Sequence, residues 1–142
     1  MNKRVISVLL VLFLLFSLLP ISSLAAQTRA SDYIFSTSAS LSTGASPGQI
    51  KLSYSVCSAV GIADSIGISK IEVYRSNGTL YKTIYGSISN GLMGTNAASK
   101  SGNYTTACSA GSSYYCVVTF TVSKGGGGDT YTTTTNTATA HT

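Results

Sequence analysis

The stretch Ser113-Tyr114-Tyr115-Cys116-Val117-Val118-Thr119-Phe120-Thr121-Val122-Ser123 decides the fold. Every second residue is apolar or aromatic, from Tyr114 to Val122, and the positions between them carry mostly hydroxyl side chains. Successive side chains of a strand point to opposite sides of a sheet, so a period of two is typical of a half-buried strand. The stretch therefore predicts a strand with one face in the core.

Similar alternation recurs along the chain. It predicts six further strands, at Tyr33–Leu41, Gln49–Val56, Ser69–Arg75, Leu80–Tyr85, Asn103–Cys108 and Asp129–Thr139. Asn77-Gly78 is a strong hairpin signal, whereas residues 58–68 and 86–102 are expected to be connections. Seven short strands with no helical pattern between them indicate an all-β protein with one antiparallel β-sandwich domain.

The N-terminal segment has the layout of a secretory signal. Basic Lys3 and Arg4 precede an apolar run over Val5–Leu19, and small residues follow up to Ala25. The run is shorter than the roughly 20 residues that span a bilayer, so no membrane anchor is expected after cleavage. The expected organisation of the secreted protein is a signal peptide at 1–25, a linker at 26–32 and a β-sandwich domain at 33–140.

The charge pattern argues against a nucleic-acid partner. The chain of 142 residues has a formal charge of +5, which includes Lys3 and Arg4; removing these two leaves seven basic and four acidic residues, or +3. The remaining basic residues are scattered, whereas nucleic-acid binders concentrate them on one face.

Tyr114-Tyr115-Cys116-Val117-Val118 resembles the sixth strand of immunoglobulin-like and fibronectin type III domains. The resemblance implies that Tyr114 is the corner tyrosine, whose hydroxyl bonds back to the upstream backbone. The third strand lacks the tryptophan of antibody domains and carries Ile71 and Val73 instead, which favours the fibronectin type III-like variant.

A second resemblance covers nearly the whole mature chain. The chain is similar to a family of small secreted, uncharacterised Firmicutes proteins, and the similar stretches are Asp64-Ser65-Ile66-Gly67, Met93-Gly94-Thr95-Asn96, Ala110-Gly111-Ser112-Ser113-Tyr114-Tyr115 and Thr132 to Ala138. The resemblance implies an extracellular bacterial β-sandwich and no particular reaction.

Three cysteines allow one disulfide in an oxidising compartment. In the expected sandwich, Cys57 and Cys116 lie at opposite ends of strands that run the same way. Cys108 ends one strand and Cys116 begins the next, which predicts a Cys108–Cys116 disulfide and a free thiol at Cys57. The alternative is that all three are reduced.

Catalysis finds little support in the sequence. The single histidine, His141, is the penultimate residue, so neither a catalytic triad nor a histidine metal site can be assembled. Asp64 is expected in a loop, capping a local turn, and Glu72 on an outward face, so no carboxylate pair is expected. We expect no catalytic residue, no cofactor and no metal.

Binding is the better prospect. Strict alternation places Tyr74, Tyr81 and Tyr85 on outward faces, where tyrosine can stack on a sugar ring or simply reflect strand propensity. Leu92 and Met93 either plug the core or present an apolar contact. The expected partner is an extracellular glycan, cell-wall component or protein.

Two other functions remain open. The chain could be a structural subunit that assembles through an edge strand, with Thr132–Thr139 as the edge or donor, or through Cys57. It could also be a small secreted toxin of the bacteriocin type, which size, export and positive charge allow.

Overall fold

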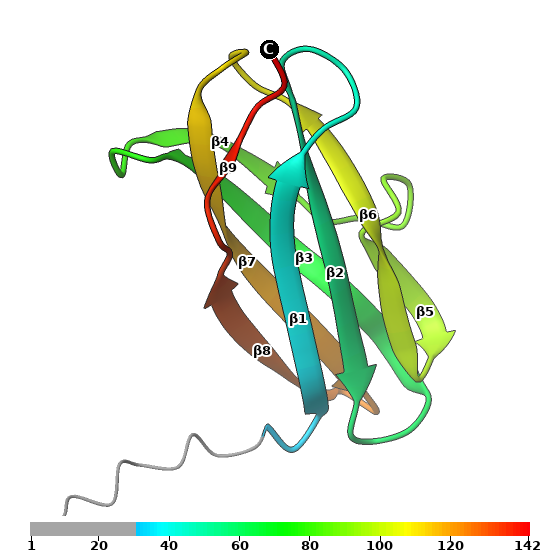
Figure 1. Cartoon of the computed structure of the whole chain (residues 1–142). Coiled ribbons are helices and arrows are strands. Elements are labelled where there is room, and N and C mark those ends of the chain that lie inside the picture. Colours follow the sequence, from blue (N-terminus) through cyan, green and yellow to red (C-terminus); the bar gives the residue numbers. More distant parts are fainter. Residues whose placement is uncertain (1–30) are drawn as a thin grey trace, which may run out of the picture.

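Two antiparallel sheets face each other in the computed structural model, which describes residues 31–142 (Figure 1). The three-stranded sheet has the order β1-β2-β6. The six-stranded sheet has the order β4-β3-β7-β8, with β5 also paired to β3 and β9 to β7. The strands are β1 Ile34–Thr43, β2 Gln49–Ser58, β3 Ala63–Arg75, β4 Leu80–Tyr85, β5 Met93–Ala97, β6 Ser99–Ala107, β7 Ser113–Lys124, β8 Gly127–Thr134 and β9 Ala138–Thr139.

This arrangement confirms the all-β antiparallel class. The predicted number of strands was wrong, because residues 31–142 form nine strands and not seven. The signal peptide predicted for residues 1–25 lies outside the described residues, as does most of the linker predicted for 26–32.

The first additional strand, β5, comes from a segment that was expected to be a connection. β3 begins at Ala63 and not at Ser69, and its early half pairs with β5. Gly67, with φ +149°, makes this pairing possible because a Cβ there would lie 2.2 Å from the carbonyl oxygen of Leu92. β5 itself contains glycine and asparagine, so tertiary pairing and not intrinsic propensity decides its conformation.

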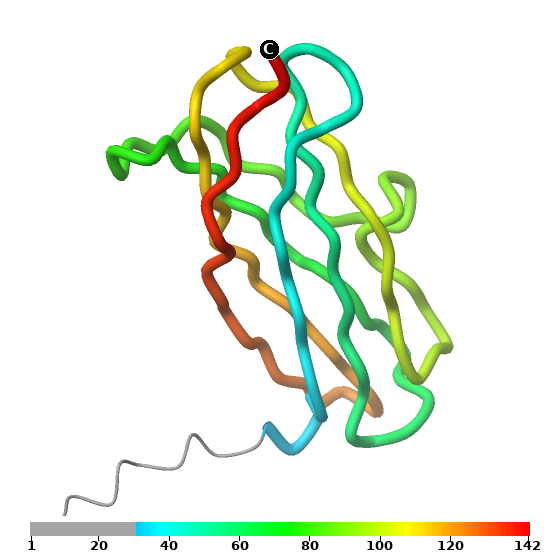
Figure 2. The backbone as a smooth tube through the Cα atoms, viewed as in Figure 1, coloured from blue at the N-terminus to red at the C-terminus, as the bar shows by residue number. Residues whose placement is uncertain are grey.

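The second additional strand, β9, arises because the last predicted strand is interrupted. At the interruption, Thr135 N donates to Cys116 O, and Cys116 N donates to Thr135 Oγ1. The threonine hydroxyl thus takes the place of a carbonyl oxygen in the ladder. Figure 2 shows the chain bending here before it ends beside the β1–β2 loop.

The core lies between the two sheets. The inward residues predicted for β7 are confirmed as buried: Tyr114, Cys116, Val118, Phe120 and Val122. The three-stranded sheet contributes Ile50, Leu52, Tyr54 and Val56 from β2. Leu92 is fully buried, which places it in the core and leaves it unable to present an apolar contact.

The two outer faces differ in character. Small hydroxyl side chains cover much of the three-stranded sheet; they are Ser36, Ser38, Ser40, Ser42, Ser53, Ser55, Ser99 and Ser101. The outer face of the six-stranded sheet carries threonines on β7 and β8 and tyrosines toward the β4 side. The tyrosines therefore distinguish one face of the molecule.

Candidate binding face

Tyr74 of β3 and Tyr115 of β7 stack on the outer face of the six-stranded sheet. They are register partners, their ring centroids lie 5.3 Å apart, and their planes differ by 9°. Both point outward, because the adjacent Val73 and Cys116 are buried in the core. The antiparallel ladder therefore brings two tyrosines that are distant in sequence together as one stacked aromatic pair.

Leu80 extends this surface toward β4. It is the register partner of Tyr74 and is 48% exposed. We call Leu80, Tyr74 and Tyr115 the tyrosine platform. An apolar surface with stacked rings presents contact area at little cost in side-chain entropy.

Tyr85 lies on the same outer face, apart from the platform. It is 73% exposed and pairs with Lys70, four residues from Tyr74 along β3, or about 13 Å at the usual strand rise. Lys70 Nζ lies 3.2 Å from Glu72 Oε1, and this ion pair occupies the space between. Tyr85 and the platform are therefore separate contact points.

The outward placement predicted for Tyr81 was wrong. A register shift between Val73 and Tyr74 makes Lys82 the partner of Val73 and Leu80 the partner of Tyr74. Tyr81, between Leu80 and Lys82, therefore has no register partner on β3. Its ring turns inward and packs edge-on against Tyr114, with centroids 5.2 Å apart and planes at 62°. A β-bulge of this kind interrupts the strict alternation on which the prediction depended.

A shallow polar cleft adjoins the platform. It has a volume of about 270 Å³ and is lined by Arg75, Ser76, Asn77, Ser112 and Ser113. Ser76 N donates to Ser113 O, which joins the two loops that form its floor. Asn77 Oδ1 accepts from Thr79 N and fixes the hairpin tip.

Arg75 lines this cleft, but it is the register partner of buried Tyr114, so its side chain starts from the core side of the sheet. Its guanidinium carbon lies 5.3 Å from the centroid of the Tyr81 ring, a distance suited to a cation–π interaction. Within residues 31–142 the one ion pair is Lys70–Glu72, so no carboxylate neutralises Arg75 there. The cleft thus offers hydroxyl and amide groups beside the tyrosine platform, and the guanidinium lies on the Tyr81 ring behind them.

Tyr114 supports the platform from beneath. Its ring is fully buried, and its Oη accepts a hydrogen bond from the backbone N of Ser109, five residues upstream. The hydroxyl therefore holds the β6–β7 connection against the strand that carries Tyr115.

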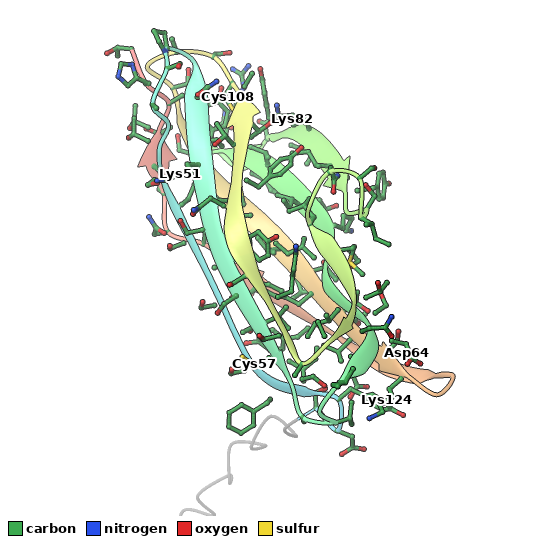
Figure 3. All side chains as sticks on the ribbon, turned by 90° about the vertical axis from the view of Figure 1, so that its right-hand side faces the viewer. Lys51, Cys57, Asp64, Lys82, Cys108 and Lys124 are labelled. Atoms are coloured by element: carbon green, nitrogen blue, oxygen red, sulfur yellow. The ribbon has the colours of Figure 1, made fainter. Side chains whose placement is uncertain are left out.

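Lys82 spans the two sheets at the same end of the molecule. Its side chain leaves β4 on the core side, and its Nζ donates to the carbonyl oxygen of Ala107 in β6. Figure 3 shows Lys82 beside Cys108. The ammonium group thus links the edge of the six-stranded sheet to the end of β6.

The disulfide predicted between Cys108 and Cys116 is not formed, and both residues are free thiols. The prediction placed Cys108 at the end of one strand and Cys116 at the start of the next, but β6 ends at Ala107, so Cys108 lies in the β6–β7 connection and its thiol is not joined to that of Cys116. Burial, together with a smaller effect of the nearby Cys108, raises the pKa of the Cys116 thiol to about 12, and Lys82 opposes the shift. Cys116 therefore belongs to the core as a neutral thiol.

Cys57 is also a free thiol, half-buried on β2. Figure 3 shows it at the end of the molecule opposite to Cys108, in agreement with the strand directions. It is remote from the platform.

The remaining candidate residues have structural positions. Met93 is half-buried at the start of β5. Asp64 was expected to cap a local turn, which was wrong: its Oδ2 accepts from Gly125 N at the distant β7–β8 hairpin. Figure 3 places Asp64 at the same end as Lys124.

Sequence alternation alone did not identify Tyr115 or the polar cleft. Tyr115 has the opposite parity to core-facing Tyr114, so an outward position could have been inferred. Its stacking on Tyr74 depends on the pairing and register of β3 and β7, which alternation does not specify.

Residues 31–142 contain no group of three His, Cys, Asp or Glu side chains placed to hold a metal ion. They contain no helix long and apolar enough to cross a membrane.

Comparison of the chain with models of known protein families, with curated proteins and with solved structures found no match.

Proposed function

We propose that this protein is a secreted, non-catalytic β-sandwich module that binds a glycan of the cell envelope through the tyrosine platform and the adjoining polar cleft. The observation that carries the proposal is the stacked, nearly parallel Tyr74–Tyr115 pair on a solvent-facing sheet surface. A buried stack would be part of a core, whereas this one has no covering element in residues 31–142.

The strand order supports a fibronectin type III-like sandwich. In immunoglobulin-like folds, the first, second and fifth strands share one sheet, and the third, sixth and seventh share the other. β1, β2 and β6 fill the first set, whereas β3, β7 and β8 fill the second, with β4 beside β3. The bond from Ser109 N to Tyr114 Oη supports the corner-tyrosine role.

The two parts of the site suit the two kinds of surface on a sugar. A pyranose ring has an apolar C–H face, which can stack on an aromatic ring face that the Tyr74–Tyr115 pair leaves free, and a rim of hydroxyl groups. Ser112, Ser113 and Asn77 can exchange hydrogen bonds with such hydroxyls, and Arg75 can pair with an acidic substituent. A few convergent polar groups beside an apolar surface are the usual composition of a ligand site.

Co-sedimentation with isolated bacterial cell walls over a salt series tests this proposal. Retention that survives high salt and is lost in Tyr74→Ala and Tyr115→Ala is the expected result, because stacking is little screened by salt. Tyr85→Ala is the matched control, since it removes an exposed tyrosine from the same face outside the platform. Binding that disappears at moderate salt, or that none of these substitutions changes, would overturn the proposal.

A further inference from the structure

The edges of the two sheets are protected unequally. An edge strand presents unpaired N–H and C=O groups to which another chain can pair, and proteins commonly block such edges. β5 and β9 are short, which limits pairing at those edges. The longer edge strands β1, β4, β6 and β8 must be protected from pairing with another chain in some other way.

One end of the β1 edge, at Leu41 and Thr43, is covered by the C-terminal segment. Asn136 Oδ1 accepts from Leu41 N at 2.9 Å, and Asn136 Nδ2 donates to Leu41 O at 2.8 Å. Farther along, Thr43 Oγ1 donates to Thr139 O at 2.9 Å. These contacts occupy the Leu41–Thr43 end of the edge and so shorten the length of β1 to which a partner strand could pair.

β4 and β6 carry lysines that face the core side of their sheets. Lys82 is the register partner of buried Val73, and Lys100 is the register partner of buried Val56. An inward-facing charged residue on an edge strand blocks edge-to-edge pairing, because a partner strand would bury the charge.

β8 has none of these protections over Thr130–Thr134. The segment contains no charged residue and no proline, and its residues have high strand propensity. The two-residue turn at Gly125 and Gly126, both with positive φ, makes Lys124 and Gly127 a hydrogen-bonded pair. Hydrogen-bonded and non-hydrogen-bonded pairs alternate along an antiparallel ladder, so Thr130, Thr132 and Thr134 of β8 occupy non-hydrogen-bonded positions. Their N–H and C=O groups therefore point away from β7.

These outward groups have no other partner in the described part of the chain. No hydrogen bond within residues 31–142 reaches the outward backbone groups of Thr130, Thr132 or Thr134. Tyr131, between them, is 44% exposed at the edge.

The open segment has defined ends. At one end, Asp129 Oδ2 accepts from Ser31 Oγ and Tyr33 N, so the N-terminal segment covers that position. At the other end, Thr135 is buried and bonded to Cys116. The unprotected length is therefore five residues, centred on Thr132.

We propose that this edge pairs with the same edge of a second copy, antiparallel about a twofold axis at Thr132. Thr132 then pairs with its own copy and Thr130 with the partner's Thr134, which uses every outward group of the segment. No charges face one another, and Tyr131 packs beside the partner's Thr133. An interface of this kind is self-complementary, as a twofold dimer requires.

The dimer has a consequence for binding, which depends on the proposed function. Antiparallel pairing continues the six-stranded sheet across the axis, so both tyrosine platforms lie on the same side of one joined sheet. Two linked sites bind a polymer more tightly than either alone. The dimer would present the platforms to one extended glycan.

Sedimentation velocity across micromolar concentrations, combined with amide hydrogen exchange, tests the proposal on protein recovered after expression of the full chain. A concentration-dependent dimer is expected, with exchange at Thr130, Thr132 and Thr134 slowing as the dimer forms. Thr132→Pro removes one outward N–H without removing a bond to β7, and Thr132→Lys places two like charges at the axis; both should abolish the dimer. Thr83→Lys is the control, because Thr83 lies on the same outer face, on β4.

A monomer at all concentrations would overturn the proposal. So would a dimer that leaves these three amides unprotected or that persists in both Thr132 variants. The exchange measurement uses the unaltered chain, so it remains decisive if a variant fails to fold. No glycan is present in these measurements, so their outcome is separate from that of the cell-wall experiment.

Discussion

The side-chain amide of Asn136 binds both backbone groups of Leu41, accepting from its N and donating to its O. One side chain from the segment between β8 and β9 thus acts as a one-residue strand partner for β1. It joins the two sheets along the side of the sandwich where they would otherwise separate.

Asn136→Ala should therefore lower the free energy of unfolding by about 1–3 kcal/mol, since it leaves two partly buried backbone groups without partners. Chemical denaturation measures the change. Asn103→Ala is the control: Asn103 is exposed, and its one bond, with Ser53 Oγ, should contribute about 0.5 kcal/mol or less. Equal losses in the two variants would contradict the role given to Asn136.

Tyr114→Phe removes the hydroxyl that accepts from Ser109 N. The expected loss of stability is about 1–3 kcal/mol, because the Ser109 N–H would lose its partner. Thermal or chemical unfolding tests this. Tyr104→Phe alters a half-buried tyrosine with no hydrogen bond of its hydroxyl in the described structure and should change stability by less than Tyr114→Phe.

Gly67→Ala tests the close approach of β3 to the Leu92–Met93 segment. A Cβ at this position meets the Leu92 carbonyl oxygen at 2.2 Å, and the backbone has φ +149°, so the expected loss is about 2 kcal/mol or more. Gly94→Ala on the paired strand is the control, because a Cβ there makes ordinary contacts of 3.5 Å or longer. If both variants unfold at the same denaturant concentration, the packing at Gly67 is not as described.

The buried thiol of Cys116 makes stability depend on pH. Its pKa is about 12 in the folded protein and near 9.0 in the unfolded chain, so between these values the unfolded state releases a proton that the folded state keeps. The free energy of unfolding should fall by about 1.4 kcal/mol per pH unit from pH 9 toward pH 12. Burial also raises the pKa of Tyr54 from 10.0, which adds to the fall at the alkaline end.

Denaturation at a series of pH values measures this slope, and Cys116→Ala should make it shallower. Alkylation of the folded protein should leave Cys116 unmodified, because the reactive thiolate is scarce and buried. Rapid modification of all three cysteines in the folded state would contradict this account.

The sequence predicted the buried faces of regular strands better than it predicted bulges, weak strands and cysteine pairing. Alternation in β7 and β2 predicted their buried faces because both strands are regular through the core. It failed at Tyr81, where a bulge changes the parity, and at β5, where pairing to β3 outweighs weak strand propensity. The Cys108–Cys116 bridge failed because alternation predicts which face a side chain lies on, and not the separation and side-chain direction that a disulfide requires.

For the candidate site, the outward position of single tyrosines was predictable from the sequence, whereas their assembly into a site was not. An outward position for Tyr74 and Tyr85 follows from local pattern, and the structure places both there. The Tyr74–Tyr115 stack and the cleft around Arg75 require the register of non-adjacent strands and the contact of two loops. Such long-range features are set by the packing of the whole domain.

The most direct test of the tyrosine platform is an NMR titration with soluble cell-wall saccharide fragments, following the ring protons of all tyrosines and the backbone amides. Shifts are expected at Tyr74 and Tyr115, together with Ser113 and Asn77 of the cleft, and none at Tyr85 or Tyr131. Saturable binding with shifts confined to other residues would contradict a binding role for the tyrosine platform. The absence of any shift, at fragment concentrations high enough to release the protein from intact walls, would contradict it as well.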